Sequence, residues 1–152
     1  MPTTVRPDRR HSSPLADVDG FVDRFAAALV RRDAPGCADL WGDAAMIVAD
    51  QFAATPTTRQ ELESFLAHAW PIYDYLDLAR IDWQIVDRVE LSESMTRIRV
   101  QFAFYDRAEA HLTDGQFEYL LRRDSAGLRC YVGVNIDAEP NLAGLARNRG
   151  HV

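Results

Sequence analysis

Residues 95–137 read MTRIRVQFAFYDRAEAHLTDGQFEYLLRRDSAGLRCYVGVNID, and this stretch decides the fold. Apolar and polar residues alternate in three consecutive runs, which is the pattern of β-strands with one buried face. Short polar segments such as 124–127 separate the runs and predict a meander of antiparallel strands. The inward positions are Ile98, Val100, Phe102, Phe104, Phe117, Tyr119, Leu121, Leu128, Cys130, Val132, Val134 and Ile136. A sheet with one apolar face needs a cover, and we expect helices from the first half of the chain to supply it.

Two helices and a strand are expected in the first fifty residues. Apolar residues recur at helical spacing from about Asp17 to Arg32, and a short second helix follows with Asp33 as its N-cap and Pro35 in its first turn. The run Ala44–Asp50 is short and rich in apolar residues, so it predicts a strand.

A third helix and the first strand of the main sheet come next. Thr58 and Glu61 have the spacing of a capping box, which predicts the start of this helix. Pro71 cannot donate a backbone hydrogen bond and is expected to kink or break it. Residues 81–91 alternate again and predict a strand. The fold class is therefore α+β.

The length of 152 residues fits one domain. We expect a flexible arm at 1–16, the domain at 17–138, and a tail at 139–152 that is either a short helix or loose.

Composition excludes several kinds of function. A formal net charge of −6 argues against a nucleic-acid groove. All seventeen basic residues are arginine, so the chain has no lysine for a Schiff base or a phosphate loop. Its two cysteines and four histidines show no metal-ligand spacing, and no metal or cofactor is expected. No run is long enough to cross a membrane and no signal peptide is visible, so we expect a cytoplasmic protein.

Two segments of the chain resemble the nuclear transport factor 2-like (NTF2-like) superfamily, which includes ketosteroid isomerase, scytalone dehydratase and the SnoaL-like polyketide cyclases. Residues 24–50, RFAAALVRRDAPGCADLWGDAAMIVAD, are similar to its opening helix pair and first strand. Residues 117–134, FEYLLRRDSAGLRCYVGV, are similar to its last two strands. The resemblance implies a cone-shaped α+β fold with a curved sheet wrapped around N-terminal helices, an apolar cavity between them, and a homodimer.

Asp50 is the first candidate catalytic residue. By resemblance it falls where ketosteroid isomerase has its proton-transferring aspartate. It is also in phase with Met46 and Val48, so an inward carboxylate would serve as a general base. The alternative is that Asp50 only turns the chain before Gln51. The tyrosine that donates to the oxyanion in ketosteroid isomerase is replaced by Phe25, which argues against steroid isomerisation.

Asp106 and His111 are a second candidate pair. If the hairpin closes on residues 107–110, the two side chains face each other on the cavity side as an acid–base pair. A solvated turn is the alternative, and we favour it. His68 lies beside the apolar stripe of the third helix and is interpreted as a surface or core residue. The expected cavity lining is aromatic: Phe25, Trp70, Tyr73, Phe104 and Tyr119.

Two functions remain open. The first is a cofactor-free isomerase, cyclase or dehydratase (lyase) acting on an apolar cyclic or polyketide-like small molecule, with Asp50 moving the proton and His111 or Tyr73 orienting an oxygen. The second is a non-catalytic small-molecule-binding or dimerisation module, since one fold supports many functions. An open apolar pocket containing a carboxylate favours the enzyme, whereas a pocket filled by its own aromatic side chains favours the module.

Overall fold

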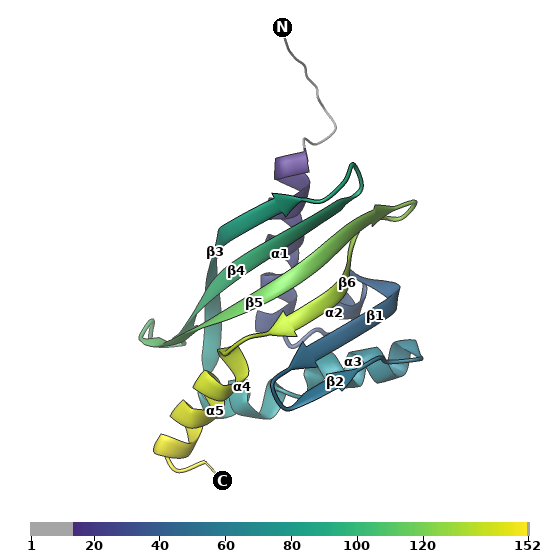
Figure 1. Cartoon of the computed structure of the whole chain (residues 1–152). Helices are drawn as coiled ribbons and strands as arrows, with labels where there is room; N and C mark the ends of the chain where they lie inside the picture. The colour runs from purple at the N-terminus through teal and green to yellow at the C-terminus, as the bar shows by residue number, and fades with distance from the viewer. Residues whose placement is uncertain (1–13, 152) are drawn as a thin grey trace, which may run out of the picture.

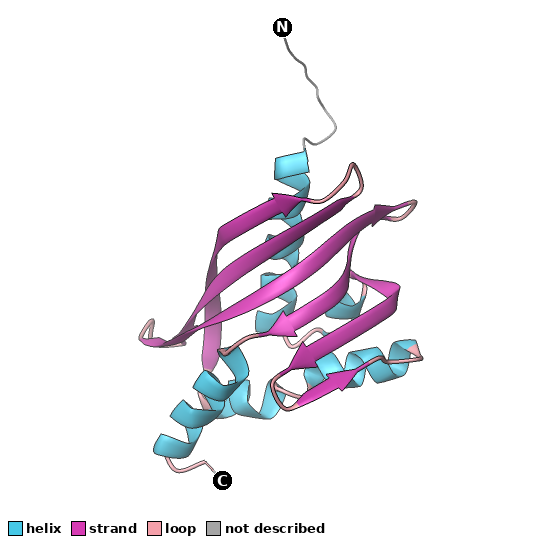
Figure 2. Ribbon diagram, viewed as in Figure 1, coloured by secondary structure: helices cyan, strands magenta, loops and turns pink. Residues whose placement is uncertain are grey.

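A six-stranded sheet and five helices make up the part of the chain that the computed structural model describes, residues 14–151. Figure 1 shows α1 running behind the sheet, with α3, α4 and α5 gathered at one end of it, and Figure 2 shows the same two layers by secondary structure. The elements are α1 (Pro14–Val30), α2 (Ala34–Ala38), β1 (Trp41–Ala49), β2 (Phe52–Ala54), α3 (Arg59–Ala67), α4 (Trp70–Tyr75), β3 (Leu78–Glu90), β4 (Met95–Asp106), β5 (His111–Asp124), β6 (Gly127–Asn135) and α5 (Ala138–Asn148).

The strand order in the sheet is β2-β1-β6-β5-β4-β3. The meander from β3 to β6 is antiparallel, as the alternation predicts, and its hairpin at Asp124–Gly127 closes where expected. β1 joins β6 in parallel, and β2 turns back along β1 as a short edge strand. The α+β class with a curved sheet is confirmed.

Local signals set most helix ends. The Asp33 carboxylate accepts a hydrogen bond from the Gly36 N–H at 2.9 Å and caps α2. The Thr58 hydroxyl accepts from the Glu61 N–H at 3.1 Å at the start of α3. The Glu61 carboxylate, however, accepts from the N–H of Thr57 at 2.8 Å, one residue earlier than the usual reciprocal pair.

Pro71 divides the third helix as predicted. α3 ends at Ala67 and α4 begins at Trp70, so His68 becomes the C-cap residue between them. In an unbroken helix His68 would be an interior helical residue. The interruption places it at a helix end, where its side chain can contact a neighbouring element.

The core lies between α1 and the inward face of the sheet. Phe21 of α1 and Val100, Phe102 and Phe104 of β4 are completely buried. Cys37 and Cys130 are buried free thiols. Burial raises the pKa of the Cys37 thiol to about 12 and raises that of Cys130 as well, so both stay protonated and act as apolar packing groups.

Two expected boundaries shift. α1 begins at Pro14 instead of Asp17, and the rest of the expected arm, residues 1–13, lies outside the described residues. Of the two alternatives for the tail, the helix is the one that forms: α5 has eleven residues, with Ala138, Leu142 and Ala146 buried. Among the described residues, no helix is long and apolar enough to cross a membrane.

Candidate functional site

A small cavity of about 90 Å³ lies between the sheet, α1, the α3–α4 junction and α5. Its walls are mostly apolar and come from every layer of the fold, including Phe25, Leu29, Trp41, Phe117, Tyr119 and Leu142. His68 is the one lining residue in the exposed class, so the cavity reaches the surface beside it.

His68 and Glu139 are the ionisable pair of this cavity. The His68 Nε2 atom is hydrogen-bonded to the Glu139 carboxylate, which joins the α3–α4 junction to α5. The side chains retain 47% and 30% of their exposure, so solvent or a ligand can reach the pair. It therefore combines a proton donor and a proton acceptor at the cavity mouth.

The start of α5 is held in place by three separate features. The Asp137 carboxylate accepts from the Gln116 N–H of β5 at 2.7 Å. Gly115 permits the close approach, because a Cβ there would lie 2.3 Å from the Cβ of Ala138. Glu139 then occupies the first turn, where the helix dipole favours an anion.

The contacts of the two ring nitrogens of His68 favour the charged, doubly protonated form of the ring. Nδ1 lies 2.5 Å from the carbonyl oxygen of Phe65, and Nε2 meets a carboxylate. Both partners are acceptors, so both nitrogens carry hydrogen only when the ring is a charged imidazolium. Consistently, the hydrogen bond from His68 lowers the pKa of Glu139, and the hydrogen bond to Glu139 raises that of His68 against the opposing effect of burial.

Two buried donors also belong to residues that line the cavity. Trp41 Nε1 and Tyr119 Oη have no hydrogen-bond partner among the described residues, and both side chains are almost completely buried. Both rings pack edge-on against Phe25, at centroid distances of 6.3 and 5.8 Å. Leaving such groups unpaired costs about 1–3 kcal/mol each, a cost that natural cores seldom carry without a reason.

Three of the five aromatic residues expected in the lining are there. Phe25, Tyr73 and Tyr119 line the cavity. Trp70 and Phe104 do not line it. They pack against Tyr73, with their ring centroids 5.6 and 6.4 Å from the Tyr73 ring. Burial raises the pKa of the Tyr73 hydroxyl, which therefore stays neutral.

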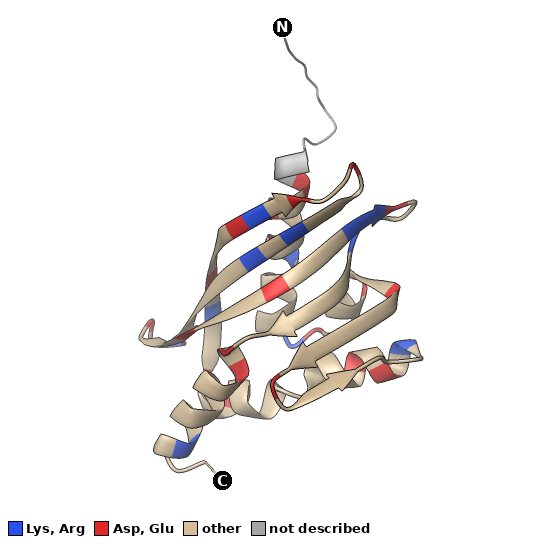
Figure 3. Cartoon of the chain, viewed as in Figure 1, with Lys and Arg blue, Asp and Glu red and all other residues tan. Residues whose placement is uncertain are grey.

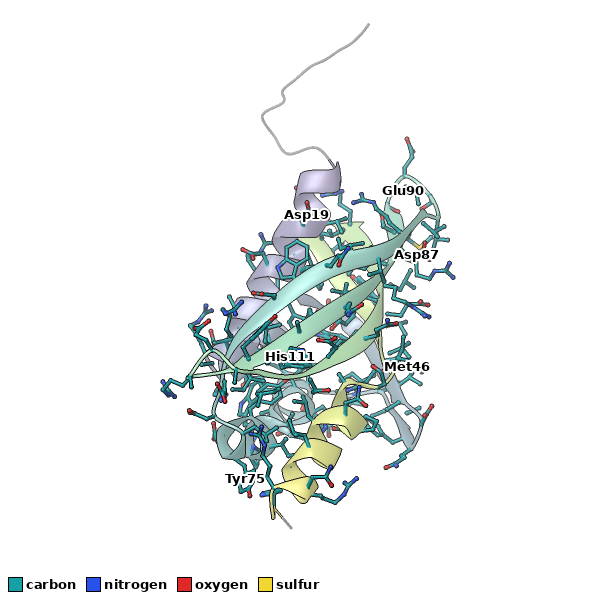
Figure 4. The ribbon with its side chains drawn as sticks, turned by 90° about the vertical axis from the view of Figure 1, so that its left-hand side faces the viewer. Asp19, Met46, Tyr75, Asp87, Glu90 and His111 are labelled. Carbon is teal, nitrogen blue, oxygen red and sulfur yellow. The ribbon has the colours of Figure 1, made fainter. Side chains whose placement is uncertain are left out.

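The inward orientation expected for Asp50 is wrong. Asp50 is exposed in the turn between β1 and β2 and does not line the cavity. Trp41, Ala45 and Ile47 alternate along β1 on its inward face, so Met46, Val48 and Asp50 have the opposite, outward phase. Ile47 faces the cavity, while Met46 is exposed on the side of the sheet away from α1 (Figure 4).

The Asp106–His111 pair does not form, so the solvated-turn alternative describes this hairpin. The Asp106 carboxylate accepts from the N–H groups of Ala108 and Ala110, both at 2.9 Å. A register shift pairs His111 with Tyr105, and its Nε2 lies 2.7 Å from the Asp114 carboxylate. Figure 4 shows His111 at the hairpin end of the sheet, where its side chain is about half exposed.

Sequence reasoning missed the pair that the structure brings together. His68 was interpreted as a surface or core residue, and Glu139 was placed in the tail. Pro71 is the sequence signal for a helix break next to His68. The run Asp137, Ala138, Glu139, Pro140 has the composition of a helix start, which is the signal for Glu139. No local pattern indicates that these two segments meet.

No group of three or more metal-binding side chains occurs within residues 14–151. Charged residues are frequent along β3, β4 and β5 and sparse along β1 and β6 (Figure 3). There the Arg99 guanidinium lies 3.1 Å from the Glu118 carboxylate.

A curved sheet, covering helices and an apolar cavity with an ionisable pair at its mouth define an NTF2-like protein. A family model described as "NTF2-like protein (DUF6841)" matches residues 16–137, and the chain belongs to this family. No functionally curated protein matches the chain.

Solved structures share the fold at low sequence identity. An NTF2-like protein of unknown function from Shewanella oneidensis is 12% identical with a TM-score of 0.66, covering 82% of this chain and 100% of that one. A domain of unknown function with a cystatin-like fold from Nostoc punctiforme is 14% identical, with a TM-score of 0.64 and coverages of 82% and 78%. A ketosteroid isomerase-like protein from Erwinia carotovora is 16% identical, with a TM-score of 0.60 and coverages of 82% and 96%. These similarities establish the fold alone.

Proposed function

We propose that this protein is a cofactor-free enzyme that moves a proton on a small apolar molecule, in a reaction of the isomerase, cyclase or dehydratase type. The observation that carries the proposal is the His68–Glu139 pair at the mouth of an apolar cavity. We therefore assign the role of general base to Glu139 instead of Asp50.

The pair supplies both halves of an enolisation. The Glu139 carboxylate takes a proton from a carbon beside a carbonyl group, and the electrons of that C–H bond form the C=C bond of the enol. The carbonyl oxygen takes the proton of His68 Nε2 as the ligand displaces the carboxylate from it. In isomerisation the proton on Glu139 is delivered to a carbon of the enol, and the enol O–H returns its proton to Nε2, so the carbonyl group and the ion pair are both restored.

The apolar walls support this chemistry in two ways. They exclude competing water from the reacting carbon, and they strengthen the attraction between charges at the mouth. Uncharged rings such as Phe25 and Phe117 also favour a neutral substrate over an ionic one.

Deuterium uptake by cyclic and aryl ketones in heavy water tests the proposal. We expect exchange at the α-carbon with the wild-type protein, a loss of about 100-fold or more in Glu139→Gln, and no change in Asp50→Asn. Asp50→Asn is the matched control because it removes an exposed carboxylate outside the cavity. Exchange lost in Asp50→Asn and retained in Glu139→Gln would overturn the assignment.

The second candidate is a binding module without catalysis. It is favoured by the packing of Trp41 and Tyr119 against Phe25, because these aromatic side chains fill most of the space between sheet and helices and leave a cavity of only about 90 Å³. Ketone binding by a folded wild-type protein without deuterium exchange would select this alternative.

A further inference from the structure

A second space adjoins the cavity. A groove of about 630 Å³ on the outside of α3 is lined by residues of β2 and α3 and ends at His68. Phe65 and His68 line both the groove and the cavity, so these two side chains stand between them.

Two phenylalanine rings supply the apolar surface of the groove, and its other lining residues are polar. The rings of Phe52 and Phe65 are stacked at a centroid distance of 6.3 Å, and the edge of Phe52 meets the His68 ring at 6.4 Å. The Glu61 carboxylate at its rim is held by the N–H and hydroxyl groups of Thr57, at 2.8 and 3.0 Å. Its negative charge at the rim disfavours an anionic ligand.

The inner cavity is too small for more than a compact group. A volume of about 90 Å³ corresponds to roughly six to nine water-sized spheres, enough for a single ring or a branched end. The rest of any longer ligand must leave through the mouth beside His68, and the groove is the apolar surface that begins there.

We infer that the groove and the cavity together form one site for an elongated, neutral ligand. Its compact apolar end occupies the cavity, its carbonyl or hydroxyl oxygen lies at the His68–Glu139 pair, and an unbranched apolar chain lies over Phe52 and Phe65. This inference rests on the proposed function, because it places the reacting oxygen at the same pair. The carboxylates of Glu139 and Glu61 disfavour an anionic ligand.

Phenyl alkyl ketones of increasing chain length, from acetophenone to hexanophenone, test the inference by calorimetric binding to the full chain. We expect the Kd to fall by up to about fourfold for each added methylene, as for apolar groups leaving water. In Phe52→Ala the gain per methylene should shrink toward none. Met46→Ala is the control, since Met46 is an exposed apolar residue on β1 that lines neither space.

The outcomes separate the two proposals. Acetophenone binding with no gain for longer ketones, or a gain that Phe52→Ala leaves intact, overturns the elongated site and leaves the proposed function standing. The absence of binding and exchange for every ketone, in a folded protein, overturns the proposed function and the elongated site with it. Far-ultraviolet circular dichroism of each variant confirms that the fold is retained.

Discussion

Gly133 lies directly against the indole ring of Trp41, and a Cβ on this glycine would be only 2.4 Å from Cη2 of the ring. The backbone of β6 thus forms the surface on which Trp41 rests at the cavity wall. The indole ring is in turn packed edge-on against Phe25, so it has packed neighbours on more than one side.

Gly133→Ala should therefore displace Trp41 and destabilise the protein by about 1–3 kcal/mol, the usual cost of overpacking. Urea unfolding measures the change. Gly144→Ala is the control: it lies within α5, and its nearest atom, at the end of the Arg147 side chain, would be 3.7 Å away. Alanine there should stabilise the protein by roughly 0.5–1 kcal/mol. Equal changes in the free energy of unfolding at the two sites would show that the contact between Gly133 and Trp41 does not limit stability.

The stability contributed by the His68–Glu139 pair should depend on pH. The pKa of His68 is raised from 6.5, so its contribution is complete below pH 6.5 and disappears as pH rises through the folded value. The pKa of Glu139 is lowered from 4.5, so its contribution is complete above pH 4.5 and disappears as pH falls through the folded value.

The free energy of unfolding of the wild type should accordingly exceed that of Glu139→Gln most between pH 4.5 and 6.5. The difference should be at most about 1 kcal/mol, because both side chains are partly exposed. Denaturation at a series of pH values measures it, with Asp50→Asn as a variant that removes a carboxylate but no ion pair among the described residues. A difference that stays constant up to pH 9 would contradict the ion pair.

The two cysteine thiols should be unreactive in the folded protein. Both are buried and their pKa values are raised, that of Cys37 to about 12, so almost no thiolate exists near neutral pH. Ellman's reagent at pH 8 should label two thiols per chain in guanidinium chloride and none on the same timescale without it. Rapid labelling of the folded chain would mean that one thiol is accessible.

Thr58 and Thr57 should differ in their importance to α3. The Thr58 hydroxyl satisfies a backbone N–H at the helix start, so Thr58→Ala should cost about 1 kcal/mol. The Thr57 hydroxyl only adds a second bond to the Glu61 carboxylate, which its backbone N–H already holds. Thr57→Ala should cost less than half as much in thermal unfolding. The reverse order would place the N-cap one residue earlier.

Local patterns were sufficient to predict most of the fold. Alternation of side chains identified β3 to β6, because the strands of a meander pair with sequence neighbours and their two faces differ in polarity. The parallel pairing of β1 with β6 could not be predicted in this way, since it joins residues more than eighty positions apart. Sequence alone also left open whether α5 is helical or loose, because its stability comes from burying Ala138, Leu142 and Ala146 against other elements.

The site was predicted less well than the fold. Phe25, Tyr73 and Tyr119 were identified because apolar periodicity marks the inward face. Asp50 was misplaced because both faces of residues 44–49 are apolar, so alternation does not tell the inward phase of Trp41 and Ile47 from the outward phase of Met46. His68 and Glu139, separated by 71 positions, meet only because a helix break and a helix start are brought together by the folded sheet.

The two edges of the sheet have a consequence for association between molecules. One edge is β2, only three residues long, which offers another chain very little backbone to pair with. The other is the thirteen-residue β3, whose register is irregular at two places and whose ion pairs join Arg80 to Asp82 and Arg88 to Glu90. Short length protects the first edge, and charge and bending protect the second. Strand addition from another molecule is therefore disfavoured at both β2 and β3.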